Sequence, residues 1–430
     1  MALLRPQPVG TLPAPAGQLL LPDVPGADDV ATLLARGTRP TEWPTDVAFF
    51  GQALAGDPAA AADLLTGGDD LAAYNRAVLI GEPDDWAALL ERVSADSEVG
   101  VMARTVAYEL GLLDAPPSPG PVDGELAAIV LTAHASSALE TDDVHRALDL
   151  LARAVGAARD ASPLLAAALL GTMSELLRDQ LGEPQAAYQA ANDGLTMLPA
   201  AADVELRSLL LMQRGLSLQL AAGRNKNQLV AAIGDLQEAV RVFRKQTHPE
   251  TWAICNQAIA LAYLAMPMSE AGDRLRPAIA VTALREVLTV LNPDESPEMW
   301  SSVQLNLANA LVYLDSSHPV QNLMEAVDLY EGALQMRQAL GDELGQARVL
   351  TNQANALAHL GERDVATERL NRAEAIFEHI GGDDSSEGLA LIADLRAELA
   401  SGETIVVRDR IPTYQPLPPL NTMSTFGEGL

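Results

Sequence analysis

Apolar residues recur at helical spacing along most of the chain, over residues 125–400. Within stretches of roughly 15 to 20 residues they return at every third or fourth position, and Gly, Pro or an Asp/Asn cluster ends each stretch. Because residues three and four apart share one face of an α-helix, this periodicity predicts amphipathic helices in direct succession. The chain is 48% hydrophobic but only 4% aromatic, and much of the apolar content is Ala and Leu, which are strong helix formers. The sequence therefore predicts an all-α protein.

The front of the chain is less regular. Amphipathic pieces at Leu71–Ile80 and Trp86–Val93 are separated by a Gly- and Asp-rich turn, which predicts an irregular helical region over residues 41–114. Residues 1–40 hold many prolines and glycines with little periodicity. This segment is therefore expected to be an extended Pro-rich leader with one short helix near Asp28–Arg36.

Pro-rich segments bound the regular region on both sides. The run APPSPGP at residues 115–121 lacks the amide hydrogens and the conformational freedom that a helix needs, so it predicts a linker. After Gly402 the chain becomes Pro-rich again, with the stretch IPTYQPLPPL, which predicts an extended Pro-rich tail over residues 403–430. The helical repeat array is therefore expected to cover residues 121–402.

A nine-residue segment, called here the repeat segment, recurs in the array. It reads NQAIALAYL at Asn256–Leu264, NLANALVYL at Asn306–Leu314 and NQANALAHL at Asn352–Leu360, and Gln213–Leu220 fits the same frame more weakly. The third position is always small, with alanine in the first three copies and Gly215 in the fourth. A small residue at a fixed place predicts a close approach of two helices, because a larger side chain would push them apart.

A second helix recurs between these copies, at Ala232–Val240 and at Ala326–Leu334. Each repeat is therefore predicted to be a helical hairpin. Leu307 and Leu311 share one face of the first helix, and Tyr330 shares one face of the second helix with its alanine neighbours. These two faces are expected to pack against each other.

The first helices resemble tetratricopeptide (TPR) repeats, which carry Asn, a hydrophobe, a small residue, Asn and Ala in this order. The small–aromatic–small signature of the second TPR helix is met by Ala326, Tyr330 and Ala333. The spacing exceeds the usual 34 residues by about ten, so the resemblance is to an extended bacterial type with long repeats. The resemblance implies a right-handed α-solenoid whose first helices line a concave groove for a peptide or a partner helix.

The resemblance also implies a set of groove residues. In the family, the early Asn bonds the backbone of a bound peptide, and the second Asn and a nearby cation assist. The corresponding positions here are Asn256, Asn306, Asn309, Arg348, Asn352 and Asn355. An amide supplies both a donor and an acceptor, so it can hold an extended backbone whatever the side chains are. The alternative is that these amides bond within the repeat or to a neighbouring turn.

The charge of the chain limits its partners. Fifty-eight acidic and 28 basic residues give a net charge of -30, which disfavours nucleic acid and membrane surfaces as partners. One local basic patch is predicted at the two ends of a helix pair, formed by Arg224, Lys226, Arg241, Arg244 and Lys245. It would suit an acidic segment, and the alternative is that these cations only complement helix ends.

Catalytic signatures are not found in the sequence. It contains no phosphate-binding GxxxxGK[ST] or GxGxxG loop, no HExxH and no GxSxG, and its six histidines lack ligand spacing. The single cysteine, Cys255, excludes an internal disulfide and is expected to be buried. We therefore expect a cytoplasmic protein with no enzymatic activity, no metal and no cofactor.

The predicted function is that of an interaction scaffold or adaptor that binds a partner peptide or subunit through the TPR-like groove and the tails. For this type of protein in GC-rich bacteria, two settings fit. One is an adaptor in signalling or peptidase-linked systems, and the other is an assembly factor for a multi-subunit redox enzyme such as a hydrogenase. The alternatives are an enzyme with its site in residues 41–114 and a structural subunit of an oligomer.

Overall fold

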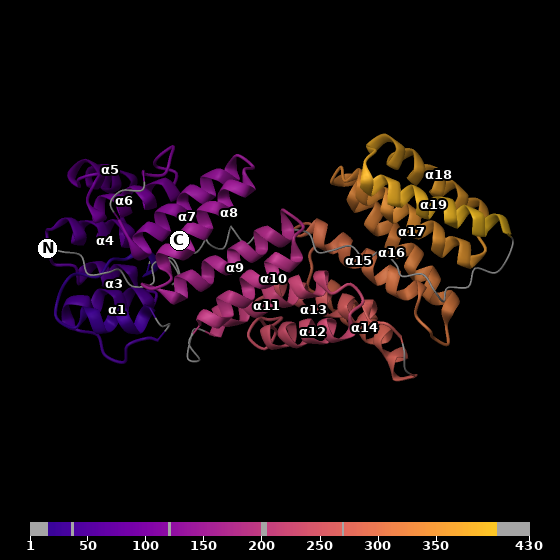
Figure 1. Cartoon of the computed structure of the whole chain (residues 1–430), viewed down its shortest axis with the longest axis horizontal. Coiled ribbons are helices and arrows are strands. Elements are labelled where there is room, and N and C mark those ends of the chain that lie inside the picture. The colour runs from indigo at the N-terminus through magenta and orange to yellow at the C-terminus, as the bar shows by residue number, and fades with distance from the viewer. Residues whose placement is uncertain (1–15, 36–37, 119–121, 199–203, 269–270, 402–430) are drawn as a thin grey trace. The chain divides into compact units, whose positions relative to one another are not determined.

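The computed structural model describes residues 16–35, 38–118, 122–198, 204–268 and 271–401, and these form nineteen α-helices, three short 3-10 helices and no strand (Figure 1). The all-α prediction is therefore confirmed for the described residues. The chain divides into two compact units between Ser217 and Leu218, inside helix α11 (Val204–Ala221). Each unit is described by itself.

The first unit begins with short helices and continues with longer ones. Its elements before α11 are the 3-10 helix η1 (Ala16–Gln18), α1 (Ala27–Ala35), the 3-10 helix η2 (Thr45–Val47), α2 (Ala48–Leu54), α3 (Pro58–Asp63), α4 (Asp70–Ile80), α5 (Pro83–Arg92), α6 (Glu98–Glu109), α7 (Gly124–Glu140), α8 (Val144–Ala158), α9 (Pro163–Asp179) and α10 (Pro184–Met197). Helix α1 confirms the short helix expected in the leader, and α4 and α5 confirm the two amphipathic pieces expected after it.

The second unit consists of longer helices in succession. After α11 they are α12 (Lys226–Ala239), α13 (Pro249–Ala265), the 3-10 helix η3 (Ala271–Leu275), α14 (Arg276–Leu288), α15 (Pro297–Val312), α16 (Pro319–Ala339), α17 (Glu343–Leu360), α18 (Arg363–Ile380) and α19 (Asp383–Ser401). Several of them begin with Pro, whose missing amide hydrogen costs nothing in the first turn of a helix. Helix α17 ends at Gly361, whose left-handed φ of 86° favours glycine.

Consecutive helices pack in pairs within each unit. In the first unit α7 packs on α8 and α9 on α10, and in the second unit the pairs are α13 with α14, α15 with α16 and α17 with α18. Successive pairs also contact each other, through α8 and α9, α14 and α15, and α16 and α17, and α18 contacts α19. Figure 1 shows α16 beside α17 in the second unit, and both α18 and α19 lie next to α17. This arrangement is consistent with a repeat-like array of helical hairpins.

The second helices of the pairs share one buried pattern, and this pattern also occurs in helices for which no repeat was predicted from the sequence. An alanine is followed four positions later by a second buried residue and seven positions later by a small or β-branched one, and all of these residues are buried. The sets are Ala147, Leu151 and Ala154 in α8; Ala187, Ala191 and Gly194 in α10; Ala232, Leu236 and Ala239 in α12; Ala280, Leu284 and Val287 in α14; Ala326, Tyr330 and Ala333 in α16; and Ala366, Leu370 and Ala373 in α18.

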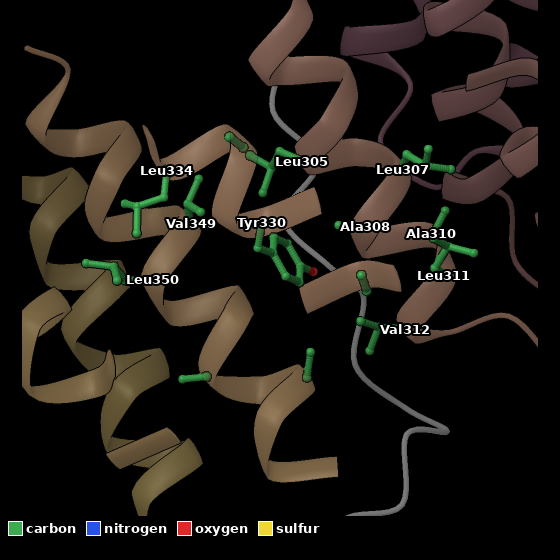
Figure 2. Packing of buried hydrophobic residues seen from close by; sticks show 14 of the residues in the cluster. Leu305, Leu307, Ala308, Ala310, Leu311, Val312, Tyr330, Leu334, Val349 and Leu350 are labelled. Carbon is green, nitrogen blue, oxygen red and sulfur yellow. The ribbon is translucent and has the colours of Figure 1, made fainter. Parts of the chain in front are cut away.

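The core of the second unit corrects the expectation about which side of α15 packs against α16. Tyr330 and Leu311 are both 1% exposed, as predicted for core residues. However, Figure 2 shows Leu307 and Leu311 on the side of α15 that is turned away from Tyr330. The side facing α16 instead carries Asn309, which accepts a hydrogen bond from the Tyr330 hydroxyl. Helix α15 lies between α14 and α16, so both of its sides are apolar and the pattern alone does not indicate which one meets α16.

The leader is more than an extended segment. Ala16, Leu19, Leu20 and Leu21 are at most 1% exposed, so this part belongs to the core of the first unit. Residues 1–15 and the predicted tail at 403–430 lie outside the described residues, as do residues 119–121 of the predicted linker. The proposed domain boundaries at 40, 114, 121 and 402 therefore stay predictions.

Candidate partner-binding face

Helix α17 carries three of the predicted groove residues, Arg348, Asn352 and Asn355, along one of its sides, and His359 continues their line. Arg348, Asn352, Asn355 and His359 follow one another at steps of four, three and four residues, which places them in one line along the helix. All four are half-buried. We call these residues the α17 stripe. The predicted groove residues of α13 and α15 occupy the corresponding positions of their own helices.

Both predicted groove residues of α15 are buried. Asn306 is 0% exposed and Asn309 is 1% exposed. The Tyr330 hydroxyl of α16 donates to Asn309 Oδ1 at 2.6 Å, and Arg337 Nη2 of α16 donates to the Ser302 hydroxyl at 2.6 Å. The buried amide of Asn309 helps to hold the pair together, because leaving it unpaired would cost about 1–3 kcal/mol. For Asn309 this favours the alternative of bonding within the repeat.

The remaining amides differ from one helix to the next. Asn256 of α13 is half-buried, and its Nδ2 donates to the main-chain oxygen of Trp252 at 2.8 Å. Asn355 of α17 donates to the hydroxyl of Tyr313 at 3.2 Å, which links α17 to the end of α15. Asn352 is half-buried, and its side chain forms no hydrogen bond with any residue that the structure describes. The structure thus gives no uniform row of open amides and leaves Asn352, between Arg348 and Asn355, as the most available one.

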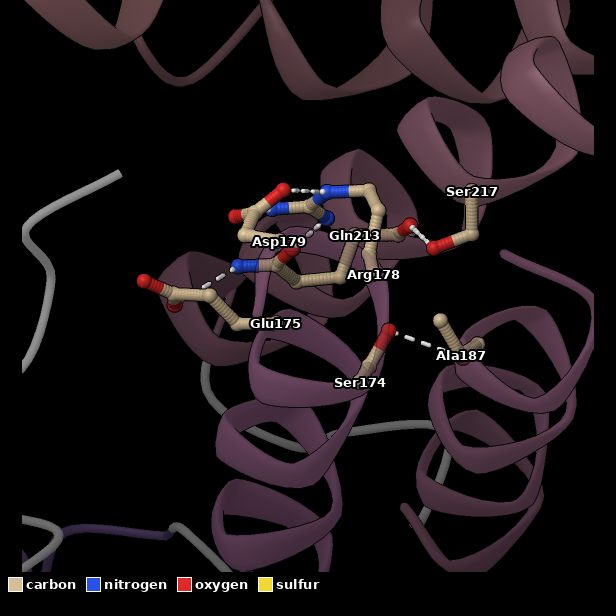
Figure 3. A network of polar contacts seen from close by, with 7 residues as sticks. All are labelled: Ser174, Glu175, Arg178, Asp179, Ala187, Gln213 and Ser217. Atoms are coloured by element: carbon tan, nitrogen blue, oxygen red, sulfur yellow. Dashed lines mark hydrogen bonds and ion pairs between the residues drawn. The ribbon is translucent and has the colours of Figure 1, made fainter. Parts of the chain in front are cut away.

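A buried polar network occupies the equivalent place in the first unit. Gln213 of α11 stands at the first position of the repeat segment and is 1% exposed. Figure 3 shows it between α9 residues, where Arg178 Nη1 donates to its Oε1 and its Nε2 donates to Glu175 Oε2 at 3.3 Å. Arg178 also forms a two-point ion pair with Asp179, at 2.7 and 2.6 Å. Such buried charges persist only when paired, so this network fixes α9 against α11.

Sequence reasoning missed this network. It aligned Gln213 with the asparagines but assigned no role to Glu175 or Arg178. The available signal was a pair of charged residues, three positions apart, in the otherwise apolar sequence of α9. Two charges on one side of a helix that is otherwise apolar indicate a partner on the facing helix.

The predicted basic patch is divided by α12. Arg224 and Lys226 lie at the beginning of this 14-residue helix, and Arg241, Arg244 and Lys245 follow its end. A helix of this length spans about 20 Å, so the two groups do not form one surface. Lys226 lies 4.0 Å from Asp273, Arg241 lies 2.8 Å from Glu238, and Lys245 lies 3.4 Å from Glu286. Three of the five cations are therefore already paired with carboxylates.

Cys255 is buried as expected, with 0% exposure. Burial away from water raises the pKa of its thiol to about 12. Because the thiolate is the nucleophilic form, the Cys255 thiol is expected to be unreactive near neutral pH.

A metal centre and a membrane span have no candidate in the described parts of the chain. In these ranges, no group of three or more His, Cys, Asp or Glu side chains is placed to hold a metal ion. Likewise, none of the described helices combines the length and the apolar character that crossing a bilayer requires.

No protein-family model and no curated protein matches this chain.

Proposed function

We propose that this chain is a non-enzymatic interaction scaffold whose repeat array is TPR-like, a right-handed α-solenoid of hairpins. The shared buried pattern of the second helices supports repeats of one kind, because each repeat can bury its apolar face only against a neighbour. Within one unit, stacked repeats of this kind present successive first helices on one side, which suits the capture of an extended segment of another protein.

The observation that carries this proposal is the amide of Asn352. It lies in the α17 stripe, half-buried and not used by any described residue, while Asn309 and Asn355 each bond a tyrosine. A half-buried amide with free donor and acceptor groups can bond the main chain of an extended partner at both its N–H and its C=O. Arg348, one turn before it, adds a cation to the same side of the helix.

The chain itself contains an example of this recognition. In the first unit, Asn75 of α4 accepts a hydrogen bond from Leu20 N at 2.9 Å and donates one to Leu20 O at 2.8 Å. Both bonds go to main-chain atoms and therefore do not depend on the side chain that is held. The same chemistry at Asn352 would take a protein segment in extended conformation.

The partner is therefore proposed to be a protein with an exposed extended segment. Adaptor work in a signalling or peptidase-linked system and assembly of a multi-subunit redox enzyme such as a hydrogenase both fit this chemistry. The identity of the partner distinguishes them, because only the second setting requires a subunit of the redox enzyme.

The test is affinity capture with mass spectrometry, followed by measurement of affinity for the captured partner. Asn352→Ala is expected to weaken binding by about tenfold, the loss of about 1.4 kcal/mol expected for two hydrogen bonds. Asn227→Ala, at an exposed position in α12, is the matched control and is expected to bind like the wild type. Equal affinity of Asn352→Ala and the control would refute the α17 stripe as the binding surface.

A further inference from the structure

The buried part of the leader, residues 16–21, is called here the strap. Among the described residues, three hydrogen bonds join its main chain to the rest of the unit, and all of them involve side chains of α4. The Tyr74 hydroxyl donates to Gln18 O at 2.7 Å, and Asn75 bonds both Leu20 N and Leu20 O. A fourth, longer bond joins the Gln18 side chain to Glu109 Oε2 at 3.5 Å. The strap is thus recognised through its backbone, like a bound peptide.

The leucine side chains of the strap enter two different apolar clusters. Leu19 and Leu21 belong to the cluster that contains Phe50 of α2, whereas Leu20 belongs to the cluster that contains Tyr74 and α5. Alternate side chains pointing in opposite directions are the mark of an extended segment. The site therefore accepts an extended segment with large aliphatic residues at consecutive positions.

A short connection leads from the strap to the first helix. Pro22–Gly26 lead from Leu21 to the start of α1, and the residues that bond the strap lie 55 or more positions further along. Nothing in these bonds requires that the strap and α4 belong to the same molecule. The one sequence that the site is seen to hold is the chain's own, and every copy of the protein carries it.

We propose that the strap site of the first unit also takes the strap of a second copy, so that two molecules associate by strap exchange. Each exchanged strap would keep the same bonds to Tyr74 and Asn75, and Pro22–Gly26 would act as the hinge. Exchange of an identical element is a low-cost route to a dimer, because no new contacts are needed inside the site. The intramolecular strap is favoured by its high effective concentration, so exchange requires concentrated protein.

Charge gives the association a characteristic salt dependence. Each copy carries a net charge of -30, and two such molecules repel each other in dilute buffer. Salt screens this repulsion, so the exchanged dimer is expected to gain population as ionic strength rises. The bonds within the site lie away from water and are expected to change little with salt.

Complementation between two full-length variants tests the proposal. Leu20→Asp places a charge on the strap but keeps the site, and Asn75→Asp keeps the strap but removes the donor to Leu20 O. Each variant alone is expected to be monomeric by light scattering, and their mixture is expected to form a heterodimer that isotope labelling identifies in native mass spectrometry. A mixture that stays monomeric would overturn the proposal. Loss of helicity in Leu20→Asp alone would also overturn it, because the site would then require its strap in order to fold.

Hydrogen exchange on the unmodified protein provides a measurement that needs no variant. If the strap can leave its site while α4 stays folded, the Leu20 amide will exchange faster than the amides in the middle of α4. If the Leu20 amide exchanges its hydrogen no faster than those α4 amides, the strap leaves its site only when the whole unit unfolds. That result would refute the proposed strap exchange.

Discussion

Asn75 binds both main-chain polar groups of Leu20, with Oδ1 2.9 Å from Leu20 N and Nδ2 2.8 Å from Leu20 O. Asn75 is 1% exposed and so is Leu20. An isolated stretch of chain without helix or sheet partners would leave these two groups unpaired in the core. The side-chain amide takes the place that a neighbouring strand would take in a sheet.

Replacement of Asn75 by Ala is expected to destabilise the first unit by about 2–5 kcal/mol, because a buried N–H and a buried C=O lose their partners together. Urea unfolding followed by circular dichroism measures this loss. Asn227→Ala serves as the control, since Asn227 is exposed. A shift no larger than that of the control would show that water or another group replaces the amide.

Replacement of Gln257 by Leu is expected to stabilise the second unit. Gln257 is 0% exposed, and neither atom of its amide has a hydrogen-bond partner among the described residues. The next copy of the repeat segment carries Leu307 at this position, which shows that the hairpin accommodates leucine. Removing a buried unpaired amide should raise the free energy of unfolding by about 1–3 kcal/mol. The increase is measured as a higher midpoint of urea unfolding. A lower midpoint would mean that the amide is satisfied in solution.

Two substitutions at Tyr330 separate the packing of its ring from the bonding of its hydroxyl. Tyr330→Ala empties a site that is 1% exposed between helices and is expected to cost about 3–5 kcal/mol. Tyr330→Phe keeps the ring and removes the hydroxyl that donates to Asn309, so a cost of about 1 kcal/mol is expected. Thermal and urea unfolding measure both values. Equal effects of the two variants would contradict the packing of the ring seen in Figure 2.

Cys255 is expected to report on unfolding of the second unit. Its thiol pKa is raised from about 9 to about 12 by burial, so a thiol reagent at pH 8 should react with the native protein at the rate of opening and with the unfolded protein at once. The folded state holds this proton more tightly than the unfolded state. Its contribution to stability is therefore complete below pH 9 and is lost as the pH rises from about 9 to about 12. Fast reaction of the native protein at pH 8 would contradict this.

The local order of the chain follows from the sequence. The spacing of apolar residues predicted helices at Leu71–Ile80 and Trp86–Val93, and the structure has α4 and α5 there. The small third position of the repeat segment predicted a close approach of two helices, and Ala308 at this position is 0% exposed. Helix formation and the need to bury an apolar stripe depend on residues three and four apart, so the sequence determines them directly.

The surroundings of the polar side chains were decided by the tertiary structure. Asn306 and Asn352 hold the same place in the repeat segment, yet Asn306 is 0% exposed while Asn352 is half-buried. Five cations close in sequence are divided by the length of α12, and Leu20 meets Asn75 across 55 positions. Periodicity shows that a helix has a buried side. It does not show which neighbour covers that side, because this depends on how distant segments pack.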